Sequence, residues 1–68
     1  MELLTTQQVS EITGIPEGTL RYYRANDRGP RSGKLGGRAV RYRRSDVEDW
    51  IKSQMDDTAR GGRPQEVA

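Results

Sequence analysis

A basic segment, residues 21–44, is the feature that most constrains the fold, because its charges must stay at the surface. It holds nine Arg and Lys residues against one acid, Asp27, which gives a local net charge of +8 in a chain of net charge +2. Such charges repel each other, and folding alone does not favour their concentration. A phosphate backbone is a natural counter-surface, since each neutralised phosphate releases counterions. A solvated loop is the alternative, but the interleaved apolar and aromatic residues favour nucleic-acid binding.

Composition limits the chemistry that the chain can perform. None of its 68 residues is Cys or His, which removes disulfides, thiol nucleophiles, the usual zinc ligands and the commonest general base. The sequence also has no phosphate-binding loop and no clustered carboxylate pair. We therefore expect one small domain that binds no cofactor or metal and is not an enzyme.

The chain also lacks membrane and export signals. No apolar stretch approaches the roughly 18 residues of a membrane-spanning helix, and no basic start followed by an apolar run marks a signal peptide. We expect a cytoplasmic protein without a membrane partner. The last residues lack apolar periodicity and are rich in Gly, Arg and Pro, so residues 1–56 are the expected folded domain and residues 57–68 a disordered tail.

Two short helices are predicted in the first third of the chain. Thr5 and Gln8 have capping-box spacing, and Val9 and Ile12 then form an apolar face. Gly14 is expected to end this first helix, over residues 6–13, with Ile15 closing back on the core.

The second predicted helix covers residues 17–25. Pro16 and Glu17 suit its start, and its core face is expected to carry Leu20 and Tyr23. Gly18 has two open interpretations, tolerance of a fraying turn or close approach to another molecule. The basic side chains of this helix, with Tyr22, are expected to point away from the core.

A β-hairpin and a third helix are predicted next. Residues 34–35 and 39–42 alternate around a Gly-Gly-Arg turn, which is typical of a hairpin. Ser45 and Glu48 repeat the capping-box spacing, and the third helix then runs from about residue 46 to 55. Its core face would carry Val47, Trp50 and Ile51, with Trp50 fully in the core and Met55 as an extension.

The expected fold class is mainly α with a small β-hairpin. Two short helices joined by a glycine turn form a helix-turn-helix unit, whose second helix enters the major groove of DNA. The hairpin that follows would be a wing. A wing tipped by glycines can enter the minor groove and carry an arginine into its negative potential.

Five segments of the chain resemble one known family, the excisionase-type, MerR-like winged helix-turn-helix domain. The likeness covers about residues 3–52 and agrees in the order and spacing of its segments. Residues 19–23 also resemble the recognition helix of MerR-type transcription regulators. The segments are Leu3-Leu4-Thr5-Thr6, Gly14-Ile15, Thr19-Leu20-Arg21-Tyr22-Tyr23, Lys34-Leu35-Gly36-Gly37-Arg38 and Arg44-Ser45-Asp46-Val47-Glu48-Asp49-Trp50-Ile51.

The resemblance implies a function. Stand-alone domains of this kind are often recombination directionality factors of phages and integrative elements, which bind and bend attachment-site DNA and direct a separate integrase toward excision. The implied partners are double-stranded DNA, an integrase, and neighbouring protomers side by side on the DNA. The chain departs from the family pattern at Pro16, where Ser or Thr is common, at Glu17 and Gly18, and in the longer segment 26–33.

Twelve residues are the predicted DNA-binding set. Arg21 and Arg24 can contact guanine or phosphate, while Glu17 either accepts a hydrogen bond from cytosine or only favours the helix dipole. Two residues have alternative interpretations. Tyr42 either packs in the wing or contacts DNA, and Arg44 either contacts a phosphate or is solvated. The set is Glu17, Gly18, Thr19, Arg21, Tyr22, Arg24, Lys34, Gly36, Gly37, Arg38, Arg41 and Arg43.

Three functions fit these features. The first is a DNA-bending excisionase, and the second is a small transcription regulator of a phage or mobile element. The third is a protein-interaction module, such as an antitoxin, that uses the basic segment against an acidic partner. MerR regulators add a long dimerising helix and an effector domain that this sequence does not contain, so we expect no effector sensing.

Overall fold

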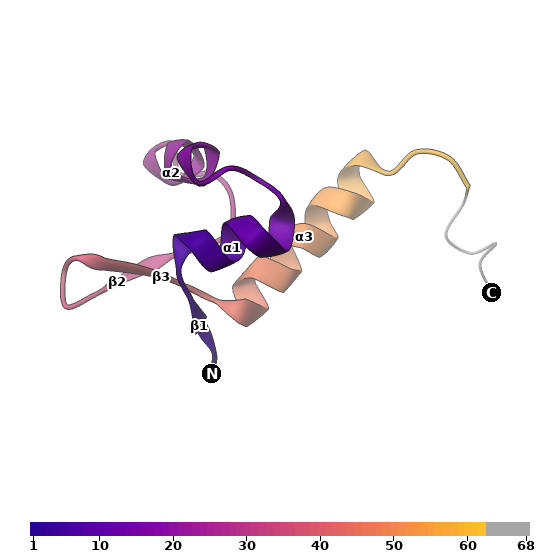
Figure 1. Ribbon diagram of the computed structural model, residues 1–68. Helices are drawn as coiled ribbons and strands as arrows, with labels where there is room; N and C mark the ends of the chain where they lie inside the picture. The colour runs from indigo at the N-terminus through magenta and orange to yellow at the C-terminus, as the bar shows by residue number, and fades with distance from the viewer. Residues whose placement is uncertain (63–68) are drawn as a thin grey trace.

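The computed structural model describes residues 1–62 as three helices and a small antiparallel sheet (Figure 1). The mainly helical, winged helix-turn-helix architecture expected from the sequence is confirmed. In chain order the elements are β1 (Leu3–Leu4), α1 (Thr6–Thr13), α2 (Glu17–Ala25), β2 (Gly33–Leu35), β3 (Ala39–Arg43) and α3 (Arg44–Thr58).

The bounds of α1 and α2 follow from their terminal residues. The Thr5 amide donates to Gln8 Oε1 at 2.8 Å, and the Gln8 amide donates to Thr5 Oγ1 at 3.1 Å, which forms the predicted capping box. Gly14 ends α1 with a left-handed φ of 76°. Pro16 then precedes α2 without a side-chain cap, so three residues separate the two helices, and both have the predicted lengths.

The sheet has the strand order β1-β3-β2, with β3 in the centre. The predicted hairpin is present, and β2 pairs with β3 through Leu35 opposite Ala39. The sequence did not predict β1, in which Leu4 lies opposite Tyr42. A strand of two residues carries no alternating pattern, so only its pairing with β3 reveals it.

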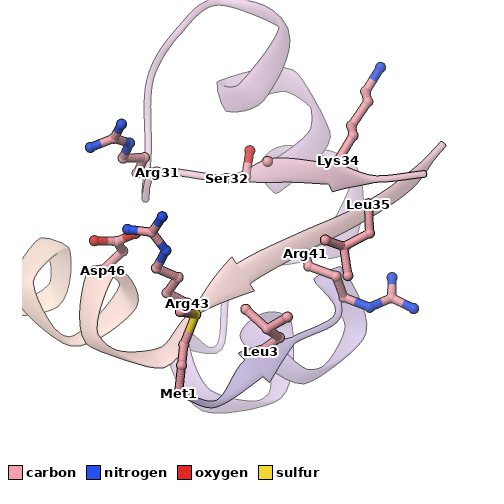
Figure 2. A pocket seen from close by; sticks show the side chains of 10 residues that line it. Met1, Leu3, Arg31, Ser32, Lys34, Leu35, Arg41, Arg43 and Asp46 are labelled. Atoms are coloured by element: carbon pink, nitrogen blue, oxygen red, sulfur yellow. The ribbon is translucent and has the colours of Figure 1, made fainter. Parts of the chain in front are cut away.

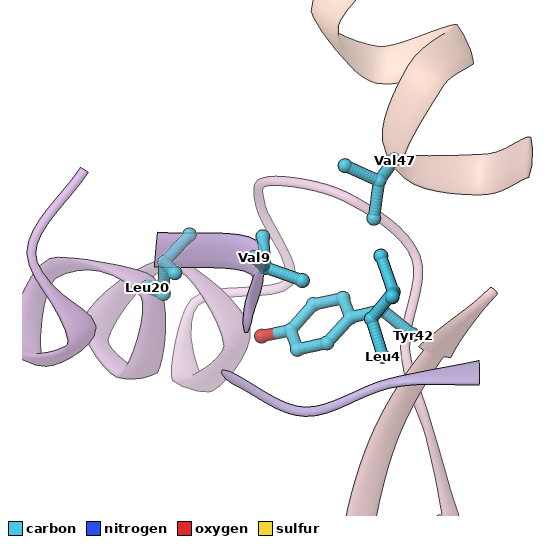
Figure 3. Packing of buried hydrophobic residues seen from close by; sticks show 5 residues of the cluster. All are labelled: Leu4, Val9, Leu20, Tyr42 and Val47. Carbon is cyan, nitrogen blue, oxygen red and sulfur yellow. The ribbon is translucent and has the colours of Figure 1, made fainter. Parts of the chain in front are cut away.

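The core consists of five side chains that come from five different elements (Figure 3). β1, α1, α2, β3 and α3 each supply one, and none of the five is more than 2% exposed. The open question about Tyr42 is therefore answered, since its ring is buried at 1% exposure. The five residues are Leu4, Val9, Leu20, Tyr42 and Val47.

Five residues expected on core faces lie at or beyond its edge, and two of them, Tyr23 and Ile51, are half-buried. Ile12 is 45% exposed, because α1 presents Val9 and Thr13 to the interior, four residues apart. Met55 is 65% exposed near the end of α3. Trp50 is half-buried and packs against Tyr23, with ring centroids 6.4 Å apart. The expectation that Trp50 is a full core residue is wrong, since Tyr42 occupies the interior.

The start of α3 also differs from the expectation. The helix begins at Arg44 with Arg43 at its cap, and no side chain caps it, so the predicted box of Ser45 and Glu48 does not form. β3 continues directly into α3, because pairing with β1 fixes the backbone up to Arg43. α3 ends at Thr58, and residues 63–68 of the predicted tail lie outside the described residues, so its disorder stays a prediction.

An ion pair ties the N-terminus to the start of α3. Arg44 Nε lies 2.6 Å from Glu2 Oε1, and the Arg44 amide donates to the Glu2 carbonyl at 2.9 Å. Glu48 lies 3.9 Å from the same guanidinium. Arg44 therefore has carboxylate partners within the protein. From the sequence, only phosphate or solvent had been considered for this side chain.

Leu20→Ala should destabilise the protein strongly, because it leaves a cavity in a core of only five residues. We expect a loss of about 2–5 kcal/mol, as for other buried leucines, which a domain this small barely survives. Ile12→Ala on the neighbouring helix is the control and should cost under about 1 kcal/mol. Urea denaturation followed by circular dichroism measures both, and equal losses would contradict this core.

Glu2→Gln should remove a pH-dependent part of the stability. The hydrogen bond from Arg44, and then its charge, lower the pKa of Glu2 below its ordinary value of 4.5. A carboxyl with a lowered folded-state pKa stabilises the protein above its unfolded pKa and loses that effect as pH falls through the folded pKa. The wild-type protein should therefore be more stable than Glu2→Gln at neutral pH, and the two stabilities should converge in acid.

Thermal melts from pH 7 to pH 2.5 compare the two proteins, with the exposed Glu11→Gln as the control for loss of one negative charge. Parallel curves for wild type and Glu2→Gln would show that the ion pair does not contribute to stability.

Candidate nucleic-acid interface

The exposed face of α2 carries four of the predicted DNA-binding residues. Glu17, Gly18, Arg21 and Tyr22 are exposed there, and Thr19 is half-buried. Glu17 lies one turn before Arg21, and their side chains approach to 3.8 Å at the surface. Pairs as exposed as this one contribute little to stability, so Arg21 is free to exchange Glu17 for an anion on a partner.

Gly18 has no packing reason to be glycine. A Cβ placed there would meet only the flexible end of Arg21, at 3.8 Å, which is ordinary contact. Gly18 therefore lowers helix propensity by up to about 1 kcal/mol without relieving any clash inside the protein. Two explanations of Gly18 remain. Either the backbone approaches another molecule closely at this residue, or the first turn of α2 simply tolerates a glycine.

Arg24 differs from the expectation that it points away from the core. Its side chain is half-buried, and Nη1 donates to the buried Tyr42 hydroxyl at 3.3 Å. The geometry follows from helical spacing, because Arg24 lies four residues after the buried Leu20 and so shares its side of α2. Arg24 thus stands at the border between the core and the exposed face.

The tip of the wing is thin and basic. Gly36 and Gly37 have φ values of 60° and 81°, which favour glycine, and the Arg38 amide donates to the Leu35 carbonyl at 3.3 Å. These positive angles are the form that matches the twist of a tight hairpin. Arg38 is exposed beside the turn, and no atom lies within 4 Å of a Cβ at either glycine.

The remaining wing residues fall on two opposite faces of the sheet. Lys34 lies opposite Val40 in the register, on the face that α1 and the core cover. Arg41 and Arg43 alternate with Val40 and Tyr42 and so lie on the other face. The register therefore directs the Lys34 side chain away from those of Arg41 and Arg43, although all three residues border one hollow.

An open hollow of about 500 Å³ lies on the face of the sheet that holds Arg41 and Arg43 (Figure 2). Arg31, from the segment before β2, and Asp46, from α3, border it. Its apolar side chains, Met1, Leu3 and Leu35, are all exposed. The hollow is therefore an apolar surface with a basic rim, separate from the exposed face of α2.

Sequence reasoning missed Arg28 and Arg31 as site residues. Both border a second hollow of about 380 Å³, together with Arg24, where the chain leaves α2. Their presence in the basic run was the available signal. Segment 26–33 had been treated as turn chemistry, so their convergence with Arg24 was not predicted.

Comparison with known protein families identifies the type of domain that carries this surface. The model of a helix-turn-helix domain family matches residues 3–55, which covers α1, α2, the wing and most of α3. The chain belongs to this helix-turn-helix family. No curated protein and no solved structure gives a significant match to the chain.

The helix-turn-helix domain accounts for the surface described above. DNA binding is the role of such a domain, with α2 in the position of the recognition helix. Within residues 1–62, no three His, Cys, Asp or Glu side chains are grouped to hold a metal ion. In the same part of the chain, no helix combines the length and apolar character needed to cross a membrane.

Gly18→Ala separates the two explanations for Gly18. The helix should gain up to about 1 kcal/mol of stability, since alanine fits the free protein without a clash. If the backbone of α2 approaches DNA at this residue, affinity should fall although the thermal midpoint rises. Fluorescence anisotropy with a labelled duplex measures affinity, and Ala25→Gly, which opposes the stability change on the same exposed side, is the matched control. Unchanged affinity would favour tolerance.

Proposed function

We propose that this helix-turn-helix protein is a DNA-bending excisionase, a recombination directionality factor. It binds the attachment-site region of a phage or mobile element and directs a partner integrase toward excision. It breaks no bonds itself, and catalysis belongs to the integrase. The observation that supports this function is a basic recognition helix and a glycine-tipped wing with Arg38, combined in one small domain.

Binding is expected to divide between the two elements. Arg21 on the exposed face of α2 is placed to contact a base edge or phosphate in the major groove. Arg38 on the thin tip is placed to enter the minor groove, where a narrow width concentrates negative potential. Two contacts on either side of a bend can offset the roughly 1–6 kcal/mol that bending 20–30 base pairs requires.

Self-association on DNA is part of the same proposal. Protomers bound side by side would extend the bent region and present a continuous surface to the integrase. The opposite signs on the protein's surface, basic in residues 21–44 and acidic along α3, support contacts between neighbours. DNase footprinting at increasing protein concentration measures the size of the protected region.

Arg38→Ala should reduce affinity and the DNA bend together, because Arg38 supplies the charge at the wing tip. A circular-permutation gel shift on an attachment-region duplex measures the bend. In a recombination assay, the variant should reduce excision more than integration. Lys52→Ala is the control, since it removes one positive charge from the exposed side of α3, where Lys52 pairs with Asp56.

Three outcomes would contradict the proposal. Equal bends for wild type and Arg38→Ala would leave the wing without an architectural role. Bending without any effect on recombination would favour a transcription regulator. Binding that does not prefer the duplex over competitor DNA would favour a protein-interaction module.

A further inference from the structure

The second hollow lies where the chain passes from α2 to the wing, and it gathers three arginines. Arg24 comes from the last turn of α2, and Arg28 and Arg31 from the connection to β2. Ser32 adds a hydroxyl, and Asp27 is the one acid on its border. Three positive charges against one negative charge make this hollow suited to an anion.

Neutral aromatic groups hold two of these arginines in place. The Tyr42 hydroxyl accepts a hydrogen bond from Arg24 Nη1 at 3.3 Å. The guanidinium carbon of Arg28 lies 5.6 Å from the centre of the Tyr23 ring, in a cation–π contact. Neither partner carries a negative charge, so both guanidinium groups are oriented while their charge is retained.

Two other arginines have carboxylates beside them. Arg21 lies near Glu17, and Arg44 is paired with Glu2 and Glu48. Within residues 1–62, no ion pair involves an arginine of the hollow or Asp27. Arg24, Arg28 and Arg31 therefore keep their charge and lie together at one hollow.

The connection that carries Arg28 is held in a defined shape. The Arg28 amide donates to the Tyr23 carbonyl at 2.7 Å, and Asp27 has a φ of 57°. Gly29 follows with a φ of 77°, and a Cβ there would lie 3.1 Å from Tyr23 Cβ, so the backbone passes close against this ring. Pro30 is buried. The hollow therefore exists before any ligand binds.

The end of α2 does not oppose an anion as strongly as a bare helix C-terminus would. Helix carbonyls carry partial negative charge, but amides of the connection satisfy those of the last turn. Asn26 donates to the Tyr22 carbonyl from its side chain at 2.8 Å, and the Asp27 amide donates to the Arg24 carbonyl at 3.2 Å. The guanidinium charges therefore dominate the hollow.

We infer that this hollow seats one backbone phosphate of the bound duplex, with Tyr42 and Tyr23 as positioning residues for Arg24 and Arg28. The inference rests on the proposed DNA binding and adds a contact between the recognition helix and the wing. A guanidinium fork matches the geometry of phosphate oxygens. The contact carries no sequence information and fixes the register of α2 on the DNA.

The first test measures affinity against salt for wild type and for Arg28→Gln/Arg31→Gln. Loss of one phosphate contact should make the plot of log affinity against log salt concentration less steep by about 0.9. If both proteins bind alike at 1 M salt, the variant then binds roughly eightfold more weakly at 0.1 M. The loss should be equal on an attachment-region duplex and a scrambled duplex. The control, Lys52→Gln/Arg60→Gln, removes two positive charges elsewhere and should change the slope by less than half as much.

The second test removes the phosphate charge instead of the arginines. Neutral methylphosphonates are placed singly along the duplex. One position should weaken wild type severalfold and the Arg28→Gln/Arg31→Gln variant much less, since that variant keeps only Arg24 at the hollow. Equal effects on both proteins at every position would overturn the inference.

The third test addresses Tyr42, whose ring is in the core and whose hydroxyl holds Arg24. Tyr42→Phe keeps the ring and should weaken DNA binding severalfold, and adding Arg24→Gln should then cost less than it does in wild type. Additive losses, or full binding by Tyr42→Phe, would show that the hydroxyl does not position Arg24. Melting curves check that the variant remains folded.

The wild-type titration separates this inference from the proposed function. A wild type with no salt dependence and no preference for duplex would overturn DNA binding itself. A steep wild-type slope, with variants that behave like the charge control, would leave DNA binding intact and remove the phosphate from this hollow.

Discussion

The burial of Tyr42 is the interaction on which the rest of the structure depends. Its ring belongs to a core to which five elements contribute one side chain each, so no element packs independently of the others. Its hydroxyl reaches Arg24 on α2 at 3.3 Å. Because Tyr42 lies on β3, the central strand, the same residue connects the sheet, the core and the recognition helix. The position of α2 relative to the wing is therefore fixed by packing and by one polar contact.

Much of the fold could be predicted because its signals are local. Capping at Thr5 and the glycine at residue 14 define α1, and two consecutive glycines define the hairpin. The features that were missed depend on pairing between distant residues. β1 exists only because Leu4 lies opposite Tyr42, and α3 begins early because β3 continues into it.

The candidate site shows the same division between local and distant signals. The exposed residues of α2 follow from helical periodicity, so Arg21 and Tyr22 could be assigned from spacing. Spacing also puts Arg24 on the side of Leu20, but its hydrogen-bond partner, a tyrosine 18 residues further along the chain, could not be predicted. Trp50 was expected in the core because it shares the apolar face of α3 with Val47 and Ile51, but helical spacing does not decide how deeply each residue of a face is buried. Tyr42 occupies the interior because the strand pairing directs it inward.

The distribution of partners among the arginines links stability to function. A segment of net charge +8 repels itself in the free protein, and neutral partners such as Tyr42 and Tyr23 do not relieve that repulsion. A carboxylate beside Arg24 or Arg28 would stabilise the free domain but would have to be displaced, or buried unpaired, when a phosphate arrived. Aromatic partners avoid this conflict, since they orient a guanidinium without neutralising it. At this hollow no ion pair offsets the repulsion, so the core has to do so, and binding of an anionic duplex would add stability to the free domain.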